Sequence, residues 1–251
     1  MAKEHTVVKG LVLRSVDTKE SDKILTVLTA DKGKMTVIAK GARSRRSKVT
    51  AAAQLLAYSE LVLSESRGWQ YLTEASTIEL FAGVRQDVEL LSLASYFAEL
   101  TEVVSYEEAE AGELLSLLLN ALYALGTLKR PPELVRAAFE LKMMALIGFE
   151  PLLDSCSVCG DVFPEEPLLD IQGGVLRCVR CSTGISSKAV RLTQGALAAM
   201  RHVLYGDPKR MYSFTLGAED QRRFTQAAET YVSTVLERSF RTLEFYKSLR
   251  G

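Results

Sequence analysis

The first 80 residues of the chain contain short runs in which apolar and polar residues alternate. Thr6 to Leu13 and Lys23 to Ala30 are rich in Val, Leu and Ile, and polar residues separate the two runs. Asp31-Lys32-Gly33 then leads into Lys34 to Ala39, in which every second side chain falls on the same face. A period of two predicts β-strands, and a glycine-containing turn between two such runs predicts a hairpin.

Two further runs predict another pair of strands after a polar stretch. Glu60 to Glu65 and Trp69 to Thr73 flank the turn Ser66-Arg67-Gly68. Five short strands within about 75 residues predict a small barrel over residues 1–80. A five-stranded OB-type barrel is the natural candidate, because that fold binds oligonucleotides on one face and in its loops. An SH3-like barrel would fit the periodicity nearly as well.

From about Ile78 the apolar positions change to a helical spacing. Apolar residues recur three or four positions apart between Leu80 and Phe97, and again between Leu114 and Leu125. Such spacing places them on one face of a helix. We interpret these faces as the core of a helical bundle and not as a cofactor site.

Local signals mark three more helices. Pro132 suits the first turn of a helix, and Gly148 suits its end. Thr193 is placed to cap a later helix, and Glu219 to Glu237 predict another. A mainly helical domain is therefore expected at residues 81–251, which makes the chain an α+β multidomain protein.

All four cysteines of the chain lie in one short window. Two C-x2-C pairs, Cys156 with Cys159 and Cys178 with Cys181, are separated by eighteen residues, a spacing typical of zinc sites. Four thiolates would complete a tetrahedral shell around one structural zinc ion and leave no position for substrate. We therefore predict a zinc-binding module at about 152–187, inserted in the helical domain and folded by metal binding. A redox dithiol and an iron centre are the alternatives.

The composition, with 47% hydrophobic and 25% charged residues, is that of an ordinary globular protein. No apolar window is long enough to span a bilayer, and the N-terminus lacks the apolar core of a signal peptide. We therefore expect a cytoplasmic protein without a membrane partner. Structural disulfides are rare in the cytosol, which favours the metal interpretation of the cysteines.

The net charge is zero, with 31 basic and 31 acidic residues, but the charges are unevenly distributed. Residues 1–80 carry a net charge of +4 and residues 188–251 one of +5, whereas 81–150 carry −6 and 151–187 carry −3. Such asymmetry indicates a local binding site for a polyanion.

The densest group of positive charges is the segment Lys40 to Lys48, which we call the basic loop. It holds five Lys or Arg residues among nine, with Gly, Ala and Ser between them. We expect it to be exposed and flexible, to contribute nothing to a core, and to neutralise phosphates. The alternative is an ordinary solvated loop. Other basic residues, near the C-terminus, either extend this surface or lie away from it: Lys209, Arg210, Arg222, Arg223 and Arg241.

Motifs of the common enzyme classes are missing from the sequence. There is no G-x-x-x-x-G-K-[ST] motif, no dinucleotide fingerprint, and the two histidines, His5 and His202, have no catalytic context. The acidic residues between Glu107 and Glu113 are spaced to line one side of a helix, where they would form a solvated face. We predict that the protein is not an enzyme; a metal-dependent nuclease would need an open metal site.

Several short motifs together resemble the RecO family of bacterial recombination mediators. The N-terminal ones are Lys19-Glu20-Ser21-Asp22-Lys23-Ile24, Thr29, Gly33-Lys34, Ala39-Lys40-Gly41-Ala42-Arg43 and Ser47. The later ones are Gly148-Phe149-Glu150-Pro151, Cys156-x-x-Cys159-Gly160, Gly173-Gly174 and Cys178-x-x-Cys181. Their order and spacing match as far as about Cys181, whereas the last 70 or so residues match only as generic helices.

The resemblance implies an OB domain, a helical domain and an inserted zinc module. It also implies a role without catalysis in DNA repair and homologous recombination, of the RecF pathway type. Proteins of this family bind single- and double-stranded DNA, anneal complementary strands and, with RecR, help RecA to displace single-strand-binding protein (SSB). A nucleoid-associated location follows from that role. A zinc-stabilised protein adaptor that does not anneal DNA is the alternative.

Because the family's OB face and loops are basic, the resemblance implies six phosphate contacts in this chain: Lys34, Lys40, Arg43, Arg45, Arg46 and Lys48. Lys23 and Lys32 are second choices, since a lysine in a turn is more often only solvated. Trp69 and Tyr71, on a predicted strand, could stack on bases. We expect Trp69, however, to pack in the barrel core or in its hairpin.

Overall fold

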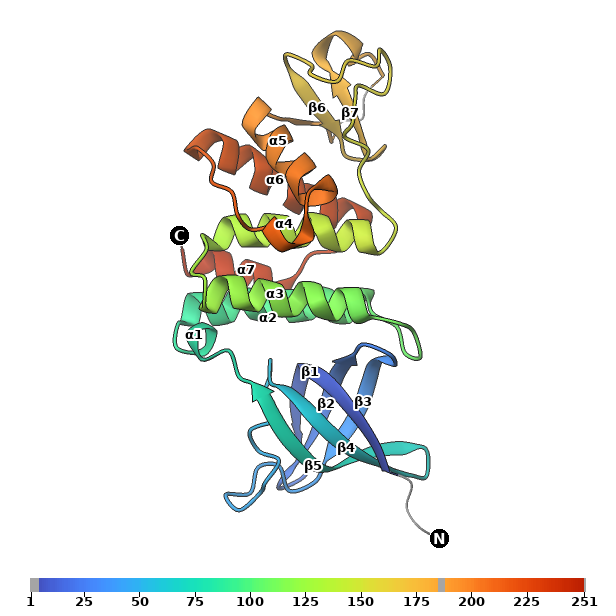
Figure 1. Ribbon diagram of the computed structural model, residues 1–251, viewed down its shortest axis with the longest axis vertical. Helices are drawn as coiled ribbons and strands as arrows, with labels where there is room; N and C mark the ends of the chain where they lie inside the picture. The colour runs from blue at the N-terminus through green and yellow to red at the C-terminus, as the bar shows by residue number, and fades with distance from the viewer. Residues whose placement is uncertain (1–4, 185–187, 251) are drawn as a thin grey trace. The chain divides into compact units, whose positions relative to one another are not determined.

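A computed structural model describes residues 5–184 and 188–250 of the chain. The described residues form two compact units (Figure 1). The first unit runs up to Thr127 and includes the segment from Phe240 onward, and the second unit is Leu128–Ser239. These units do not divide the chain at residue 80, because the helices that directly follow the barrel belong to the same unit as the barrel.

The N-terminal part of the first unit is a closed five-stranded barrel, as predicted. Its strands are β1 (His5–Thr18), β2 (Asp22–Thr29), β3 (Gly33–Ala39), β4 (Tyr58–Ser66) and β5 (Trp69–Glu79). They follow the order β1-β2-β3-β5-β4, and β4 pairs with β1 to close the barrel. All neighbouring strands are antiparallel except β3 and β5, which are parallel. This arrangement confirms the OB-type barrel.

The period of two in the strands places alternate side chains inside the barrel. On β2, Leu25 and Val27 are completely buried in the barrel core, whereas Ile24 lies on the outer face. β1 and β5 extend beyond the predicted strands, to Thr18 and Glu79. The polar residues at these ends are paired in the ladder, because strand pairing uses the backbone and tolerates polar side chains.

The connection between β3 and β4, residues 40–57, contributes to the barrel core. Ala42 is completely buried, and Val49, Ala52 and Ala53 lie in the same apolar cluster as the inward side chains of the strands. The prediction that the basic loop contributes nothing to a core is therefore wrong for Ala42. A methyl group is small enough to pack inward while the charged neighbours on both sides stay in water.

Four helices complete the first unit: α1 (Ala82–Arg85), α2 (Val88–Val104), α3 (Gly112–Gly126) and α7 (Arg241–Ser248). The helical region begins later than Ile78, because β5 continues to Glu79 and Phe81 has a left-handed backbone. α2 begins after Asp87, whose carboxylate accepts hydrogen bonds from two N–H groups of the first turn. α7, which the sequence did not predict as a separate helix, packs against α2.

The acidic residues between α2 and α3 lie in a loop. Glu107–Glu110 precede α3, and only Glu113 is helical, so the prediction of one acidic helix side is wrong. The loop pairs with the β2–β3 turn instead, where the N–H of Lys34 donates to the carbonyl of Tyr106 at 2.9 Å. Gly33 in that turn has a φ of +61° and lies directly against the loop. Tertiary pairing therefore holds the acidic segment in an irregular conformation.

The second unit contains three long helices and a small sheet. The helices are α4 (Pro132–Leu146), α5 (Gln194–Tyr205) and α6 (Ala218–Val235), and the 3-10 turns are η1 (Val179–Cys181) and η2 (Pro208–Arg210). The strands β6 (Pro167–Asp170), β7 (Val175–Cys178) and β8 (Val190–Arg191) form a sheet in the order β7-β6-β8. As predicted, Pro132 lies in the first turn of α4, and Thr193 Oγ1 caps α5 by accepting from the N–H of Ala196 at 3.1 Å.

The apolar stripes of the helices are buried within each unit. In α3, Leu118 and Leu122 are inaccessible to solvent, and the same holds for Leu141 and Met144 in α4. This agrees with the interpretation of the stripes as bundle core. No helix within residues 5–184 and 188–250 is long and apolar enough to cross a membrane.

Candidate metal centre and nucleic-acid interface

The four cysteines come together at the open end of the β6–β7 hairpin. Cys156 and Cys159 lie in a turn upstream of β6, Cys178 ends β7 and Cys181 ends η1. All four Sγ atoms lie within 4.8 Å of one another, and Cys178 Sγ is 3.8 Å from the Sγ atoms of Cys156 and Cys159. Zinc–sulfur bonds of about 2.3 Å in a tetrahedron give sulfur–sulfur distances of about 3.8 Å. The cluster therefore fits a metal ion bound by four thiolates.

The backbone around Cys156 favours the thiolate that a metal requires. Gly160, with a φ of +75°, lets its N–H donate to the carbonyl of Cys156 at 2.9 Å and close the turn. Burial raises the pKa of the Cys156 thiol, but hydrogen bonds from the N–H groups of Cys159 and Val158 outweigh it and bring the pKa to about 6. Because the thiolate is the metal-binding form, this backbone favours coordination by Cys156, whereas the hydrogen bond with Cys178 raises the pKa of the Cys181 thiol.

Three cations of the basic loop have neither an acidic nor an aromatic partner among the described residues. Arg45, Arg46 and Lys48 are exposed, and none of them forms an ion pair with another residue in the part of the chain that the structure describes. The loop is held by its own turns, and Thr50 Oγ1 donates to the carbonyl of Ala42 at 2.8 Å. The charged groups are therefore presented to solvent by a backbone that is anchored next to them. This placement suits contacts with phosphates.

Two other predicted contacts, Arg43 and Lys40, interact within the protein. The Arg43 guanidinium pairs with Asp17 at 3.2 Å, and Lys23 reaches the same carboxylate at 3.8 Å. Lys40 Nζ lies over the ring of Tyr71, 4.6 Å from its centroid. Arg43 and Lys40 are exposed. Surface pairs of this kind are weak, so either cation can exchange its present partner for a phosphate.

Lys34 has a different environment from the other predicted contacts. It is half-buried on β3, and its Nζ donates to the backbone carbonyl of Glu102 in α2 at 2.9 Å. Beside it is a hollow of about 770 Å³ that Lys32, Glu107 and Glu108 also line. Lys32 is exposed, as expected for a lysine in a turn. Acidic side chains thus surround Lys34, unlike Arg45 and its neighbours.

The aromatic side chains at the start of β5 face outward. The expectation that Trp69 packs in the barrel core or its hairpin is wrong, because 52% of its surface is exposed. It lines the same hollow as Lys34 and Met35. Tyr71, two residues further along, lies on the same face of the strand and is half-buried. Both rings can therefore be reached from outside the barrel.

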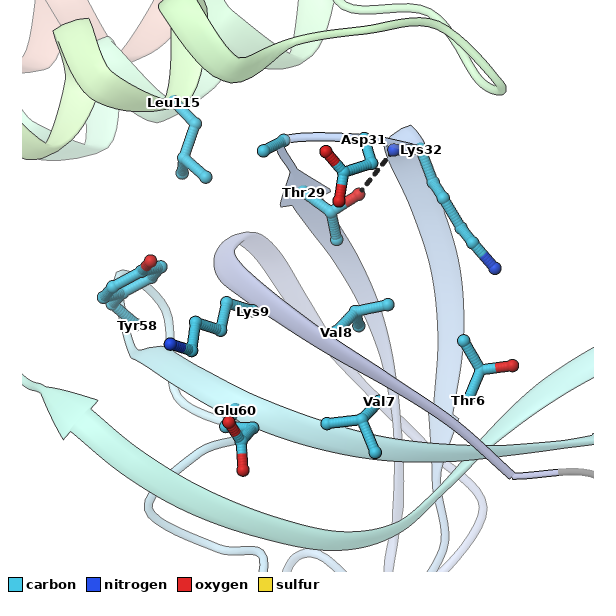
Figure 2. A pocket seen from close by; sticks show the side chains of 11 residues that line it. Thr6, Val7, Val8, Lys9, Thr29, Asp31, Lys32, Tyr58, Glu60 and Leu115 are labelled. Atoms are coloured by element: carbon cyan, nitrogen blue, oxygen red, sulfur yellow. Dashed lines mark hydrogen bonds between the residues drawn. The ribbon is translucent and has the colours of Figure 1, made fainter.

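A second hollow, for which the sequence holds no signal, lies beside β1, β4 and the β2–β3 turn. It has a volume of about 430 Å³. Figure 2 shows Lys9 and Glu60 on neighbouring strands below it, with Leu115 of α3 on the opposite side. At the turn, the N–H of Lys32 donates to Thr29 Oγ1 at 3.2 Å. Because Lys9 lies directly opposite Glu60, the hollow carries no excess of positive charge for a phosphate.

The basic residues near the C-terminus are divided between the two units. The second unit contains Lys209, Arg210, Arg222 and Arg223. Arg241 begins α7 in the first unit. Arg222 and Arg223 both pair with Glu219 one turn away on α6, so part of their charge is compensated locally.

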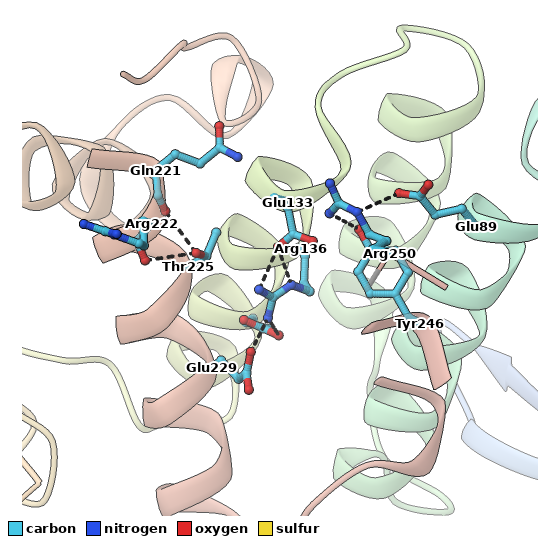
Figure 3. A network of polar contacts seen from close by, with 10 residues as sticks. Glu89, Glu133, Arg136, Gln221, Arg222, Thr225, Glu229, Tyr246 and Arg250 are labelled. Atoms are coloured by element: carbon cyan, nitrogen blue, oxygen red, sulfur yellow. Dashed lines mark hydrogen bonds and ion pairs between the residues drawn. The ribbon is translucent and has the colours of Figure 1, made fainter. Parts of the chain in front are cut away.

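A buried group of charges links α4 to α6 within the second unit. The Arg136 guanidinium pairs with Glu133 at 2.7 Å and with Glu140 at 3.1 Å. It also reaches Glu229 of α6 at 3.0 Å (Figure 3). Burial lowers the pKa of Arg136, but Glu140 and Glu133 outweigh it and raise the pKa above its ordinary value. We interpret this buried group as structural.

Comparison with known families gives two matches that together cover most of the chain. The family described as "Recombination protein O N terminal" matches residues 1–81, and the one described as "Recombination protein O C terminal" matches residues 85–244. The chain belongs to the RecO family. The resemblance to this family that the sequence motifs indicate is therefore confirmed.

Curated RecO relatives align with nearly the whole chain, and each is named DNA repair protein RecO. The protein of Acetivibrio thermocellus is 31% identical over 241 residues, which cover 96% of this chain and 95% of the relative. That of Symbiobacterium thermophilum is 32% identical over 248 residues, with 97% of each covered. That of Heliobacterium modesticaldum is 34% identical over 239 residues, with 93% and 83% covered. Membership of the RecO family supports a role in DNA repair and recombination.

Proposed function

We propose that this chain is a recombination mediator that binds single- and double-stranded DNA through the barrel domain at 1–80 and anneals complementary strands. The observation that carries the proposal is the basic loop, where Arg45, Arg46 and Lys48 are exposed and have no acidic partner within residues 5–184 and 188–250. Contacts with phosphates do not depend on base sequence, so such a loop binds any strand. A cationic surface also screens the repulsion between two strands, which is what annealing requires. The role involves no catalysis.

The same proposal includes protein partners. With RecR, the protein helps RecA to displace SSB from single strands, as expected for a RecO mediator. The acidic loop at Glu107–Glu110 supports separate surfaces for DNA and for proteins. Its negative charge repels DNA and suits contacts with proteins.

We also propose one structural zinc ion at Cys156, Cys159, Cys178 and Cys181. The sulfur–sulfur distances support this metal, and a shell of four thiolates leaves no place for a substrate. The ion would hold together the module at about 152–187 within the helical domain at 81–251. Between the two cysteine pairs acidic residues outnumber basic ones, so this module is a poor surface for phosphates.

Fluorescence anisotropy with a labelled single strand tests the DNA-binding role. We expect affinity that falls as salt is raised, and a uniform loss for all base sequences when Arg45 and Arg46 are both changed to Ala. The matched control changes Arg222 and Arg223 to Ala, which removes two arginines that already pair with Glu219. Unchanged affinity of the Arg45→Ala, Arg46→Ala protein at low salt would refute the assigned site.

A strand-annealing assay separates the mediator from the alternative adaptor. The wild-type protein should anneal complementary strands faster than they pair spontaneously. Annealing at the spontaneous rate, together with tight binding of RecR, would favour a zinc-stabilised adaptor. Labelled DNA incubated with the protein and magnesium should remain intact, whereas cleavage would contradict a role without catalysis.

A further inference from the structure

One row of side chains across the outside of the barrel is apolar. The strand register places Val16 of β1 opposite Ile24 of β2, Ile24 opposite Ile38 of β3, and Ile38 beside Tyr71 of β5. Residues that are directly opposite share one face of a sheet. Val16 is 46% exposed and Ile24 is 38% exposed, while the other two are half-buried. We call these four residues the outward row.

The outward row lies beyond the part of this face that the helices cover. The neighbouring outward residues of β1 and β2, Arg14 and Thr26, both contact Glu102 of α2. Helix α2 therefore covers the adjacent part of the face and leaves Val16 and Ile24 exposed, with Ile38 and Tyr71 partly accessible. The row does not contribute to the barrel core, which lies on the opposite face of the same strands.

Aromatic rings border the outward row, with a positive charge at the Tyr71 ring and acidic residues, Glu107 and Glu108, in the hollow that Trp69 lines. Trp69, the only tryptophan of the chain, precedes Tyr71 by two residues, lies on the same face of β5, and is 52% exposed. Lys40 places its Nζ 4.6 Å from the centroid of the Tyr71 ring, and it is also the first residue of the basic loop. An apolar strip with two rings thus lies directly next to Lys40, the first of the cations assigned to phosphate binding.

We propose that unpaired bases of single-stranded DNA lie on the outward row while their phosphates contact the basic loop. This inference rests on the proposed DNA-binding function and specifies the part of the strand that each surface contacts. Every base has a flat apolar face that stacks on aromatic side chains and packs against aliphatic ones, without regard to its identity. A chain of flat apolar groups on an anionic backbone is complementary to an apolar row bordered by cations.

The arrangement also distinguishes single strands from duplexes. In a duplex the bases are stacked on one another and paired, so their flat faces are not available to the protein, although their edges remain accessible in the grooves. The basic loop then serves both forms of DNA, whereas the outward row adds affinity for unpaired strands alone.

An oligonucleotide without bases is the sharpest probe of this inference. We compare an oligomer of thymidine with one of equal length built from abasic sites, which keeps the phosphates and removes the bases. The wild-type protein should bind the thymidine oligomer about fivefold more tightly or better, the lower end of what stacking on an aromatic residue contributes. Base stacking at this face should also quench the fluorescence of Trp69, which the abasic oligomer should leave unchanged.

Single substitutions assign the effect to the outward row. Tyr71→Ser and Val16→Ser should lose most of the preference for bases, while the slope of log affinity against log salt stays the same because the phosphate contacts remain. Tyr71→Phe keeps a ring and should retain the preference. Val7→Ser is the matched control, since Val7 is a valine of β1 with 57% exposure outside the row. Affinity for duplex DNA should be the same in all four variants.

The outcomes separate this inference from the proposed function. Equal wild-type affinity for the two oligomers, or an unchanged preference in Tyr71→Ser and Val16→Ser, would overturn the base contact, while salt-dependent binding would still support the DNA-binding role. No salt-dependent binding by the wild-type protein would overturn both. Thermal melting shows whether each variant folds, and if Tyr71→Ser does not, Val16→Ser decides the question.

Discussion

Gly33 occupies a position in the β2–β3 turn where a side chain does not fit. Its φ is +61°, and an added Cβ would lie 2.2 Å from the carbonyl oxygen of Tyr106 and 2.7 Å from that of Ala109. Gly33→Ala should therefore destabilise the first unit by about 2 kcal/mol or more, because it combines left-handed strain with displacement of the α2–α3 loop. The matched control is Gly41→Ala, with φ +63° and open space, which should cost about 1 kcal/mol. Equal losses in urea unfolding would contradict the packing argument.

Arg136 contributes to stability through the carboxylates that it pairs with. It is 4% exposed and Glu140 is 0% exposed, so the methionine variant Arg136→Met would leave a carboxylate buried without its cation. Removing one member of a buried ion pair costs about 3–5 kcal/mol, and we expect a loss of that size in chemical denaturation. Arg222→Met breaks only a surface pair and should have no measurable effect. A similar stability of the two variants would show that the buried group is not structural.

At the scale of elements, the proposed zinc module should depend on its metal more than on its core. The β6–β7 hairpin is short, and the four cysteines join its open end to η1 and to the turn upstream of β6. Cys178→Ser should reduce bound zinc well below one ion per chain and accelerate hydrogen exchange in β6 and β7. DNA affinity should not change, because the proposed contacts are on the barrel. Ser157→Ala is the control within the same turn, and loss of DNA binding in Cys178→Ser alone would contradict the separation of the two sites.

The sequence predicts elements whose signals are local. The start of α4 follows from Pro132 and the start of α5 from Thr193, because a fixed φ and a hydroxyl cap act within one turn of helix. The strands of the barrel follow from their period of two, and the metal cluster follows from the spacing of the cysteines. In each case the residues that decide the structure are near one another in the chain.

The features that the sequence does not predict depend on tertiary neighbours. Ala42 is buried because it packs against the inward side chains of the barrel strands, and Trp69 is exposed because it lies on the outer face of β5. The residues around Glu107 form a loop because they pair with the β2–β3 turn, although their spacing also fits a helix. The amino-acid composition and the spacing of apolar residues cannot predict these features.

At the scale of the whole molecule, the net charge of zero is the sum of surfaces with opposite charges. The 31 basic and 31 acidic residues cancel, yet the unpaired cations of the basic loop and the acidic α2–α3 loop belong to the same compact unit. Over distances longer than the Debye length of about 8 Å, salt screens one surface from the other. A local surface with Arg45 and Arg46 can therefore attract DNA although the chain as a whole carries no net charge.

The chain crosses between the two units twice, and this path leads to a prediction about the stability of the first unit. The chain leaves the first unit at Thr127 and returns to it at Phe240, where the ring of Phe240 packs against Tyr96 of α2 with centroids 5.4 Å apart. In addition, the N–H of Thr242 donates to Glu99 Oε2 at 3.3 Å. Helix α7 therefore completes the core of the first unit, although it follows the entire second unit in sequence.

Phe240→Ala should accordingly destabilise the first unit by about 3–5 kcal/mol, because it leaves a cavity against Tyr96. Hydrogen exchange, read separately in α2 and α4, should be accelerated in α2 and unchanged in α4. Phe245→Ala is the control on the same helix, since Phe245 is 55% exposed and its removal leaves no cavity. Acceleration of equal size in both helices would mean that the two units unfold as one, and that the return of the chain at Phe240 does not define an independent core.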